Sequence, residues 1–190
     1  MIFIFFGPPG AGKGTQAELL SNKIQLPHLS TGEILRNKLL ESDSLSDQLK
    51  KILDSGLLVS DDILNNIISK RIVLDDCKNG FILDGYPRTL IQESFLSNCI
   101  KENNFAISKI FDLHLEEKII FERIEFRSNT ESRKDDNEET IKTRIKKYQL
   151  ETKPLSEYYR KNHTKNYHII NAHQKIEMIH KDIMEIIKNG

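Results

Sequence analysis

The sequence lacks an excess of charge of either sign, a long apolar run, and enough cysteine for a structural role. Lys and Arg together number 28, as do Asp and Glu, so the formal net charge is zero. Non-specific binding to nucleic acid or to an anionic membrane needs a basic excess, and we therefore expect neither partner. No apolar run approaches the ~20 residues that cross a bilayer. Cys77 and Cys99 are too few for a disulfide framework or a four-cysteine zinc site.

The composition that is present describes one globular domain. The chain has 190 residues, of which 38% are hydrophobic and 29% are charged, a balance typical of folded chains. A chain of this length forms one domain with a full core. The apolar stretch 1–6 lacks the positive flank and the length of a signal peptide, so we expect a cytoplasmic protein.

Strand-like and helix-like segments alternate along the chain. This order predicts βαβ units, and hence a five-stranded parallel sheet with helices on both faces. The expected strands are 1–6, 26–29, 80–84, 107–115 and 167–170. The expected helices are 13–24, 31–40, 45–53, 63–74, 89–102, 116–126, 141–155 and 176–187. Two segments are expected as insertions into this core, the helical segment 30–59 and the polar segment 127–136, and Pro154 must kink or interrupt its helix.

A glycine-rich segment from Gly7 to Thr15 follows the first strand and opens the first helix. Glycines let successive backbone N–H groups curl around an anion, and a helix N-terminus adds a positive dipole end. Lys13 then reaches the terminal phosphates as a point charge. The residue after Lys13 is Gly14 and not Ser or Thr, so the usual hydroxyl on Mg²⁺ does not transfer automatically to Thr15. The segment predicts a nucleotide phosphate site.

Asp84 ends the buried strand at 80–84, at the carboxyl end of the sheet, where α/β proteins bind ligands. We interpret it as a carboxylate that orders Mg²⁺ through water, because Mg²⁺ keeps several of its waters; the alternative is a turn or cap residue. The six histidines show no spacing typical of metal ligands, and we expect structural or surface roles for them.

Four motifs carry a resemblance to a known family. They are G-x-P-G-x-G-K-G-T at Gly7–Thr15, T-G-E-x-L-R at Thr31–Arg36, L-D-G-Y-P-R-T at Leu83–Thr89, and R-x-D-D-N-E-E-T at Arg133–Thr140. With Arg144, they resemble adenylate kinases of the short-lid type, in order and in spacing. The resemblance implies the P-loop nucleoside monophosphate kinase fold. It divides the chain into a core of 1–29, 60–126 and 137–190, an AMP-binding insertion at 30–59 and a short lid at 127–136.

The same resemblance implies a reversible, Mg²⁺-dependent transfer of the terminal phosphoryl group of ATP to AMP, giving two ADP, by direct in-line transfer with lid closure. It also implies a monomer without zinc. In it, the nucleotide phosphates and water bind Mg²⁺, and Asp84 orders the ion through that water without binding it directly. The residues that it assigns to catalysis are Lys13, Asp84, Arg88, Arg123, Arg127, Arg133 and Arg144. Those that it assigns to ATP are Gly10, Ala11, Gly12, Lys13, Gly14, Thr15, Arg127 and Gln174. Those that it assigns to AMP are Thr31, Arg36, Leu57, Leu58, Val59, Gly85, Tyr86, Pro87, Arg88, Gln92, Arg133 and Arg144.

Three alternatives stay open at the level of sequence. Thr89-x-x-Gln92 is itself a capping box, so Gln92 either bonds the backbone of Thr89 or reads the AMP base. A UMP/CMP kinase uses the same scaffold, although that family tends to carry Ala and Asn where this chain has Thr31 and Thr89. A nucleotide-sensing module without catalysis is the third. The chain also departs from the family pattern at Phe126, because relatives commonly have Gly in the position before Arg127.

Overall fold

The computed structural model describes residues 1–41, 44–55, 57–131 and 138–189; the side chains of 41, 44, 45, 48 and 126–131 lie outside this description. Its centre is a five-stranded parallel sheet in the order β2-β3-β1-β4-β5. The strands are β1 (Ile2–Phe6), β2 (His28–Ser30), β3 (Phe81–Asp84), β4 (Ile107–His114) and β5 (Tyr167–Asn171). The expected fold class is therefore confirmed, with strand bounds close to those that the sequence predicts.

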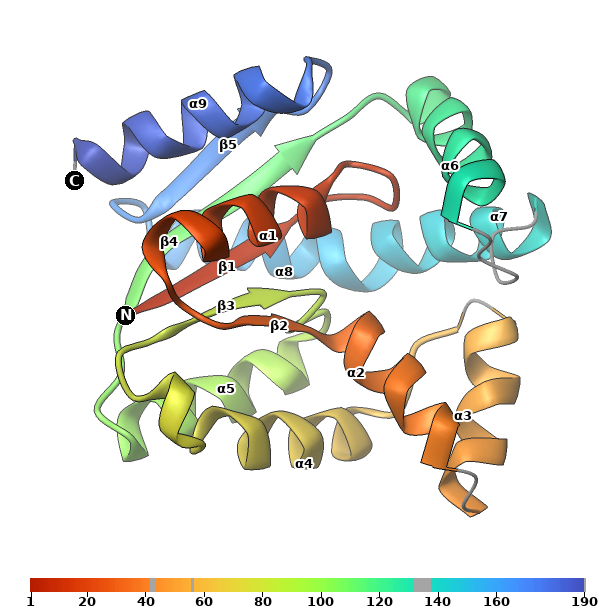
Figure 1. The fold of residues 1–190 in the computed structure, drawn as a ribbon, viewed down its shortest axis with the longest axis horizontal. Coiled ribbons are helices and arrows are strands. Elements are labelled where there is room, and N and C mark those ends of the chain that lie inside the picture. Colours follow the sequence, from red (N-terminus) through yellow and green to blue (C-terminus); the bar gives the residue numbers. More distant parts are fainter. Residues whose placement is uncertain (42–43, 56, 132–137, 190) are drawn as a thin grey trace.

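Strand β1 lies in the middle of the sheet, and every residue of it is buried. Its alternate side chains enter two different cores. Ile2, Ile4 and Phe6 pack with residues of α4 (Asp61–Ile72), α5 (Leu90–Glu102) and α8 (Lys153–Asn162). Phe3 and Phe5 pack with residues of α1 (Lys13–Ile24) and α9 (Ile176–Lys188) on the opposite face. Figure 1 shows α1 and α9 side by side on one face of the sheet, with α8 behind it.

The remaining helices lie beyond the carboxyl ends of the strands (Figure 1). Within the expected insertion 30–59, the described residues form α2 (Thr31–Lys38), the 3₁₀ turn η1 (Leu39–Glu41) and α3 (Ser44–Asp54), and no strand. Ser30 caps α2, as the capping box predicts, because its hydroxyl accepts from the N–H of Glu33 at 3.4 Å. A short 3₁₀ turn, η2 (Asp75–Cys77), leads into β3.

Helix α6 (Glu117–Glu131) is longer than the sequence predicts. The expected end at residue 126 and the expected loop from 127 are wrong for residues 127–131, which continue the helix. No Gly or Pro stands in this stretch, and each added residue of a helix gains one backbone hydrogen bond, so a polar composition alone does not end it. Residues 132–136 of the expected lid lie outside the described residues.

The expected long helix toward the C-terminus is interrupted before Pro154. Helix α7 (Glu138–Lys147) passes into one π-helical turn, η3 (Tyr148–Thr152), and then into α8, where Pro154 occupies the first turn. A proline has no N–H to donate and its ring collides with the preceding turn of an α-helix. The wider turn immediately before it resolves that conflict without breaking the helical path.

A buried carboxylate joins β4, β5 and α8. Asp112 is 2% exposed, and its Oδ2 accepts hydrogen bonds from Ser156 Oγ at 2.7 Å, from the hydroxyl of Tyr167, and from His114 Nε2 at 2.9 Å. Burial by itself raises the pKa of Asp112, but these bonds outweigh it and hold the pKa below its usual range. The carboxylate therefore fastens the edge strand and α8 to the sheet.

No helix in the described part of the chain is long and apolar enough to cross a membrane.

The buried hydroxyl of Tyr159 yields a stability prediction. Tyr159 is 0% exposed, its ring packs 5.2 Å from that of Phe6, and its hydroxyl has no hydrogen-bond partner among the described residues. Because an unpaired buried hydroxyl costs free energy, Tyr159→Phe is expected to leave the free energy of unfolding unchanged or to raise it by up to about 1 kcal/mol. Tyr159→Ala, which leaves a cavity, is expected to lower it by about 3–5 kcal/mol.

Urea unfolding followed by circular dichroism measures both variants against the wild type. A loss of stability above about 1 kcal/mol in the Phe variant would mean that the hydroxyl is satisfied in the folded chain.

Candidate active site

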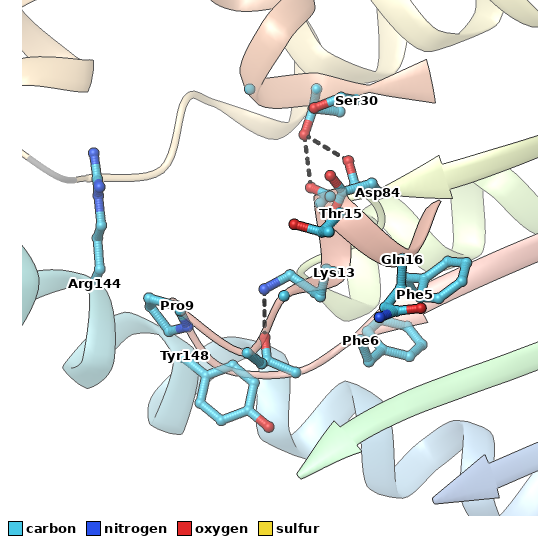
Figure 2. Close-up of a pocket in the computed structure, with 18 of the residues that line it drawn as sticks. Phe5, Phe6, Pro9, Lys13, Thr15, Gln16, Ser30, Asp84, Arg144 and Tyr148 are labelled. Carbon is cyan, nitrogen blue, oxygen red and sulfur yellow. Dashed lines mark hydrogen bonds between the residues drawn. The ribbon is translucent and has the colours of Figure 1, made fainter. Parts of the chain in front are cut away.

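A cavity of about 1190 Å³ opens at the carboxyl ends of the strands. Its walls come from the loop between β1 and α1, from α2, from the loop between β3 and α5, from α6 and α7, and from the loop before α9. Figure 2 shows Lys13 over the glycine-rich loop, with Asp84 and Arg144 entering the space from opposite sides. Segments far apart in the sequence therefore meet in one hollow.

The loop between β1 and α1 is shaped by its glycines. Gly7 has φ +138°, and a Cβ there would lie 2.6 Å from the carbonyl oxygen of Leu113. Gly10 and Gly12 have φ +76° and +88°, a region that other residues adopt only with strain. Lys13 folds back over this loop (Figure 2), and its Nζ donates to the carbonyls of Gly7 and Pro8 at 2.9 Å each. Its ammonium is thus held over the mouth of an anion-binding loop.

Asp84 faces this loop from the end of β3. It is 9% exposed, His28 Nε2 lies 3.5 Å from its Oδ2, and a Cβ on Gly14 would lie 3.3 Å from the same oxygen. Burial raises the pKa of Asp84, but His28, Lys13 and Arg88 together outweigh burial and hold the pKa below its usual range. The cavity therefore keeps a charged carboxylate beside the lysine.

Arg88 and Thr31 both bond the carbonyl of Gly85. Arg88 Nε donates to it at 2.8 Å and Thr31 Oγ1 at 2.9 Å. Gly85 has φ +77°, and a Cβ there would lie 2.7 Å from Thr31 Oγ1 and 2.9 Å from Arg88 Nη2, so only glycine fits. Burial lowers the pKa of Arg88; Arg144 acts in the same direction, and Asp84 opposes them. Two guanidinium groups close enough to repel each other form a site that favours an anion.

Arg123 closes the cavity on the side of the β5–α9 loop. Its Nη2 donates to the carbonyl of Ala172 at 2.7 Å and to that of Gln174 at 3.4 Å. Burial lowers the pKa of Arg123. The side chain of Gln174 donates to Asn171 O and to Asp182 Oδ2, each at 3.0 Å, so Gln174 meets Arg123 through its backbone.

The structure brings most of the sequence-predicted residues into this one cavity. Those that line it are Gly10, Ala11, Gly12, Lys13, Gly14, Thr15, Thr31, Arg36, Leu57, Leu58, Val59, Asp84, Gly85, Pro87, Arg88, Arg123, Arg144 and Gln174. Tyr86 and Gln92 do not line it: they are 1% and 0% exposed. Arg133 and the side chains of Phe126 and Arg127 lie outside the described residues.

Gln92 differs in detail from the capping box that the sequence predicts. Thr89 does cap α5, because its hydroxyl accepts from the N–H of Gln92 at 3.1 Å. The reciprocal bond, however, goes to the N–H of Arg88, which donates to Gln92 Oε1 at 2.7 Å, and not to that of Thr89. The side-chain nitrogen is drawn toward Asp61, to whose Oδ1 it donates at 2.8 Å.

Several cavity residues were not expected from the sequence, among them His28, Gln16 and Tyr148. His28 precedes Ser30 by two positions on β2, and the register sets Ser30 opposite Asp84, so His28 shares the carboxylate's side of the sheet. Period-two spacing along β2 could have identified it. Gln16, 1% exposed, bonds the carbonyl of Ile176 at 2.9 Å, and Tyr148 lies in the π-helical turn; no local pattern marks either.

No group of three or more His, Cys, Asp or Glu side chains in the described ranges is placed to hold a metal ion. Asp84 is a single carboxylate beside a glycine, and that arrangement fits a divalent cation bound mainly by other ligands and water.

Comparison with known proteins agrees with this geometry. Residues 5–164 match the family model described as Adenylate kinase. The chain is 40% identical over 193 aligned residues to proteins named Adenylate kinase from Brucella melitensis biotype 1 and Brucella abortus strain S19, and 39% identical to that of Brucella ovis. In each case the alignment covers 98% of both chains. With the P-loop, the paired arginines and this match over nearly its whole length, the chain belongs to the adenylate kinase family of phosphotransferases.

Proposed function

We propose that this enzyme transfers the terminal phosphoryl group of ATP directly to AMP, reversibly and with Mg²⁺, giving two ADP. The observation that carries the proposal is that a single cavity is lined by two groups of residues suited to bind anions. Lys13 and the glycine-rich loop form one, and Arg88 with Arg36 from α2 forms the other. Two phosphorylated substrates in one cavity are what direct transfer requires, because no protein nucleophile has to carry the group between them.

In the site for ATP, the phosphoryl donor, the protein residues bind the phosphates and stabilise their negative charge. Lys13 turns from the loop carbonyls to the terminal phosphates, while Gly10, Gly12 and Gly14 leave the backbone N–H groups open to them. Arg123 and Arg144 place fixed positive charge where negative charge develops during transfer. Mg²⁺, when it is bound with the nucleotide, neutralises part of the phosphate charge and fixes its geometry. Asp84, at the end of β3, would hold the water bound to that cation.

The acceptor site is supported by the residues around Gly85. Arg88 and Arg36 grip the phosphate of AMP, and Thr31 and the segment 57–59 flank its base, with Gln92 reading the base edge. Val59 is 3% exposed and Leu57 46% exposed, and both line the cavity, which gives the base an apolar surface. We include in the proposal that 30–59 is the AMP-binding subdomain.

The proposal also treats 127–136 as a short lid that brings Arg127 and Arg133 over the phosphates. Water attacks an activated phosphoryl group, so a site that closes before transfer protects it. Residues 127–131 of this segment form the end of α6, and α7, which follows it in the chain, carries Arg144, which supports a coupling between the lid and the cavity. A monomer acting in the cytoplasm completes the proposal, as the family resemblance implies.

The substrate prediction separates this function from its two alternatives. A coupled assay of ADP formation from MgATP offers AMP, UMP and CMP separately. Turnover is expected with AMP, because Thr31 and Thr89 differ from the residues typical of UMP/CMP kinases. Turnover mainly with UMP or CMP would leave the phosphate sites in place and contradict the base site. Tight binding of ADP without any turnover would instead favour the nucleotide-sensing module.

Charge removal at the two anion sites is the second prediction. Lys13→Ala and Arg88→Ala are each expected to lower kcat/KM by roughly 10³-fold or more, since a fixed cation on the transferring group has about that effect. Lys23→Ala is the matched control, because Lys23 is an exposed lysine in the last turn of the same helix α1; we expect less than about a twofold change. A loss below tenfold in both site variants would refute their assigned roles.

The third prediction concerns Asp84 and Mg²⁺. Asp84→Asn keeps the shape of the side chain and removes its charge, so the Mg²⁺ concentration that gives half-maximal rate at fixed ATP is expected to rise about 10–100-fold, as for other residues that orient a metal's ligands. Asp54→Asn on α3, an exposed aspartate, is the control. An unchanged Mg²⁺ dependence in the Asp84 variant would assign the carboxylate a purely structural part.

A further inference from the structure

The side chain of Gln92 is held at both ends of its amide. Nε2 donates to Asp61 Oδ1 at 2.8 Å, and Oε1 accepts from the backbone N–H of Arg88 at 2.7 Å. A carboxylate can only accept and a backbone N–H can only donate. Turning the amide over would set its oxygen against the carboxylate and its NH₂ against the N–H. The two partners therefore allow one orientation.

Asp61 is itself fixed in place. The hydroxyl of Thr89 lies 3.1 Å from each of its two carboxylate oxygens and also accepts from the N–H of Gln92 at 3.1 Å. The backbone carbonyl of Gln92 accepts from the hydroxyl of Tyr86 at 3.2 Å. Asp61 is the first residue of α4 and Thr89 caps α5, two helices that pack together. The ring of bonds thus belongs to the rigid core and not to the insertion.

The amide retains unused hydrogen-bonding capacity. Of the two hydrogens on Nε2 one goes to Asp61, and of the two lone pairs on Oε1 one goes to the N–H of Arg88. What remains is one donor next to one acceptor. Adenine presents the matching pair, since N1 accepts and the 6-amino group donates. A 6-oxo purine presents the reverse pair, a donating N1–H and an accepting O6, and would need the amide turned over.

We propose that Asp61 is a positioning residue which, together with the N–H of Arg88, locks the Gln92 amide in the orientation that accepts a 6-aminopurine and rejects a 6-oxopurine. This rests on the proposed function, in which Gln92 reads the base of the acceptor nucleotide. Asp61 touches no substrate; it acts through Gln92. Buried polar groups left unpaired by the wrong base provide the discrimination, and such sites reject a mismatched substrate strongly.

The amide lies directly behind the wall of the cavity. Arg88, to whose N–H it is bonded, lines the cavity, and so does Val59, two residues before Asp61. Because Gln92 is 0% exposed, a base reaches its amide by displacing the side chains that cover it. The orientation is already set when the base arrives, so specificity does not depend on a rearrangement of Gln92.

The test compares AMP with inosine monophosphate, which differs only in carrying O6 and a proton on N1. Asp61→Asn replaces an acceptor-only group by one that can also donate, and so removes one of the two constraints on the amide. The ratio of kcat/KM for AMP to that for inosine monophosphate is expected to fall about tenfold or more. Asp61→Ser, whose hydroxyl donates and accepts, is expected to do the same and serves if the Asn variant does not fold.

The ratio distinguishes positioning from mere stability, because a loosened fold lowers both rates together. Asp62→Asn, the exposed neighbour in the same first turn of α4, is the matched control and should keep the wild-type ratio. Equilibrium binding of the two monophosphates without ATP should show the same shift in their relative affinities. A ratio within threefold of wild type in the Asp61 variants would overturn the inference. A wild-type enzyme that does not turn over AMP would instead overturn the proposed function.

Discussion

Strand β1 has no face turned to water, and most of the structure depends on that constraint. A strand buried on both faces in a parallel sheet needs neighbours on either side and helices above and below. The chain supplies β3 on one side and β4 on the other, so the order reverses at β1 and its carboxyl end lies where the flanking connections diverge. The glycine-rich loop begins at that point. The position of the proposed phosphate site is thus a consequence of where the most apolar strand must lie.

The two sides of that switch point carry different parts of the site. Strands β2 and β3 deliver the residues around Gly85, including Arg88, while β4 and β5 lead to α6, α7 and the loop that Arg123 holds. Asp84 stands between them at the end of β3. Under the proposed function, a sheet divided in this way separates the two phosphorylated substrates in space and leaves one short path between them. The side chains then need only to place positive charge along that path.

Sequence patterns were sufficient for the order of the elements and for most of the residues expected at the site. The apolar run at 1–6, the alternation of strands with helices and the capping box at Ser30 rest on local rules, and the structure follows them. The glycines of the P-loop could be recognised because φ above zero and close approaches allow little else at Gly7 and Gly10. Residues that share a motif with Lys13 or Arg88 could be predicted because the motif fixes their spacing.

Contacts between distant segments could not be predicted in the same way. The local sequence marks Asp61 only as an acidic residue in the first turn of α4, favourable to the helix dipole, and nothing near it in the chain indicates that its carboxylate meets Gln92. His28 acquires its neighbour only through the register of β2 with β3. The predicted end of α6 was wrong for a different, local reason. The polar composition after residue 126 suggested a loop, but no residue there stops a helix. The contacts of Asp61 and His28 depend on tertiary packing, which a local pattern does not contain.

Gly14 bears on how the enzyme obtains its metal ion. A Cβ at this position would lie 3.3 Å from Asp84 Oδ2, so the glycine keeps the space beside the carboxylate open, and under the proposed function that space receives water and the cation that the nucleotide brings. Under the proposed function such an enzyme needs no insertion of metal after synthesis and no metallochaperone. It receives a fresh ion with every substrate, and its dependence on magnesium becomes a property of the nucleotide pool.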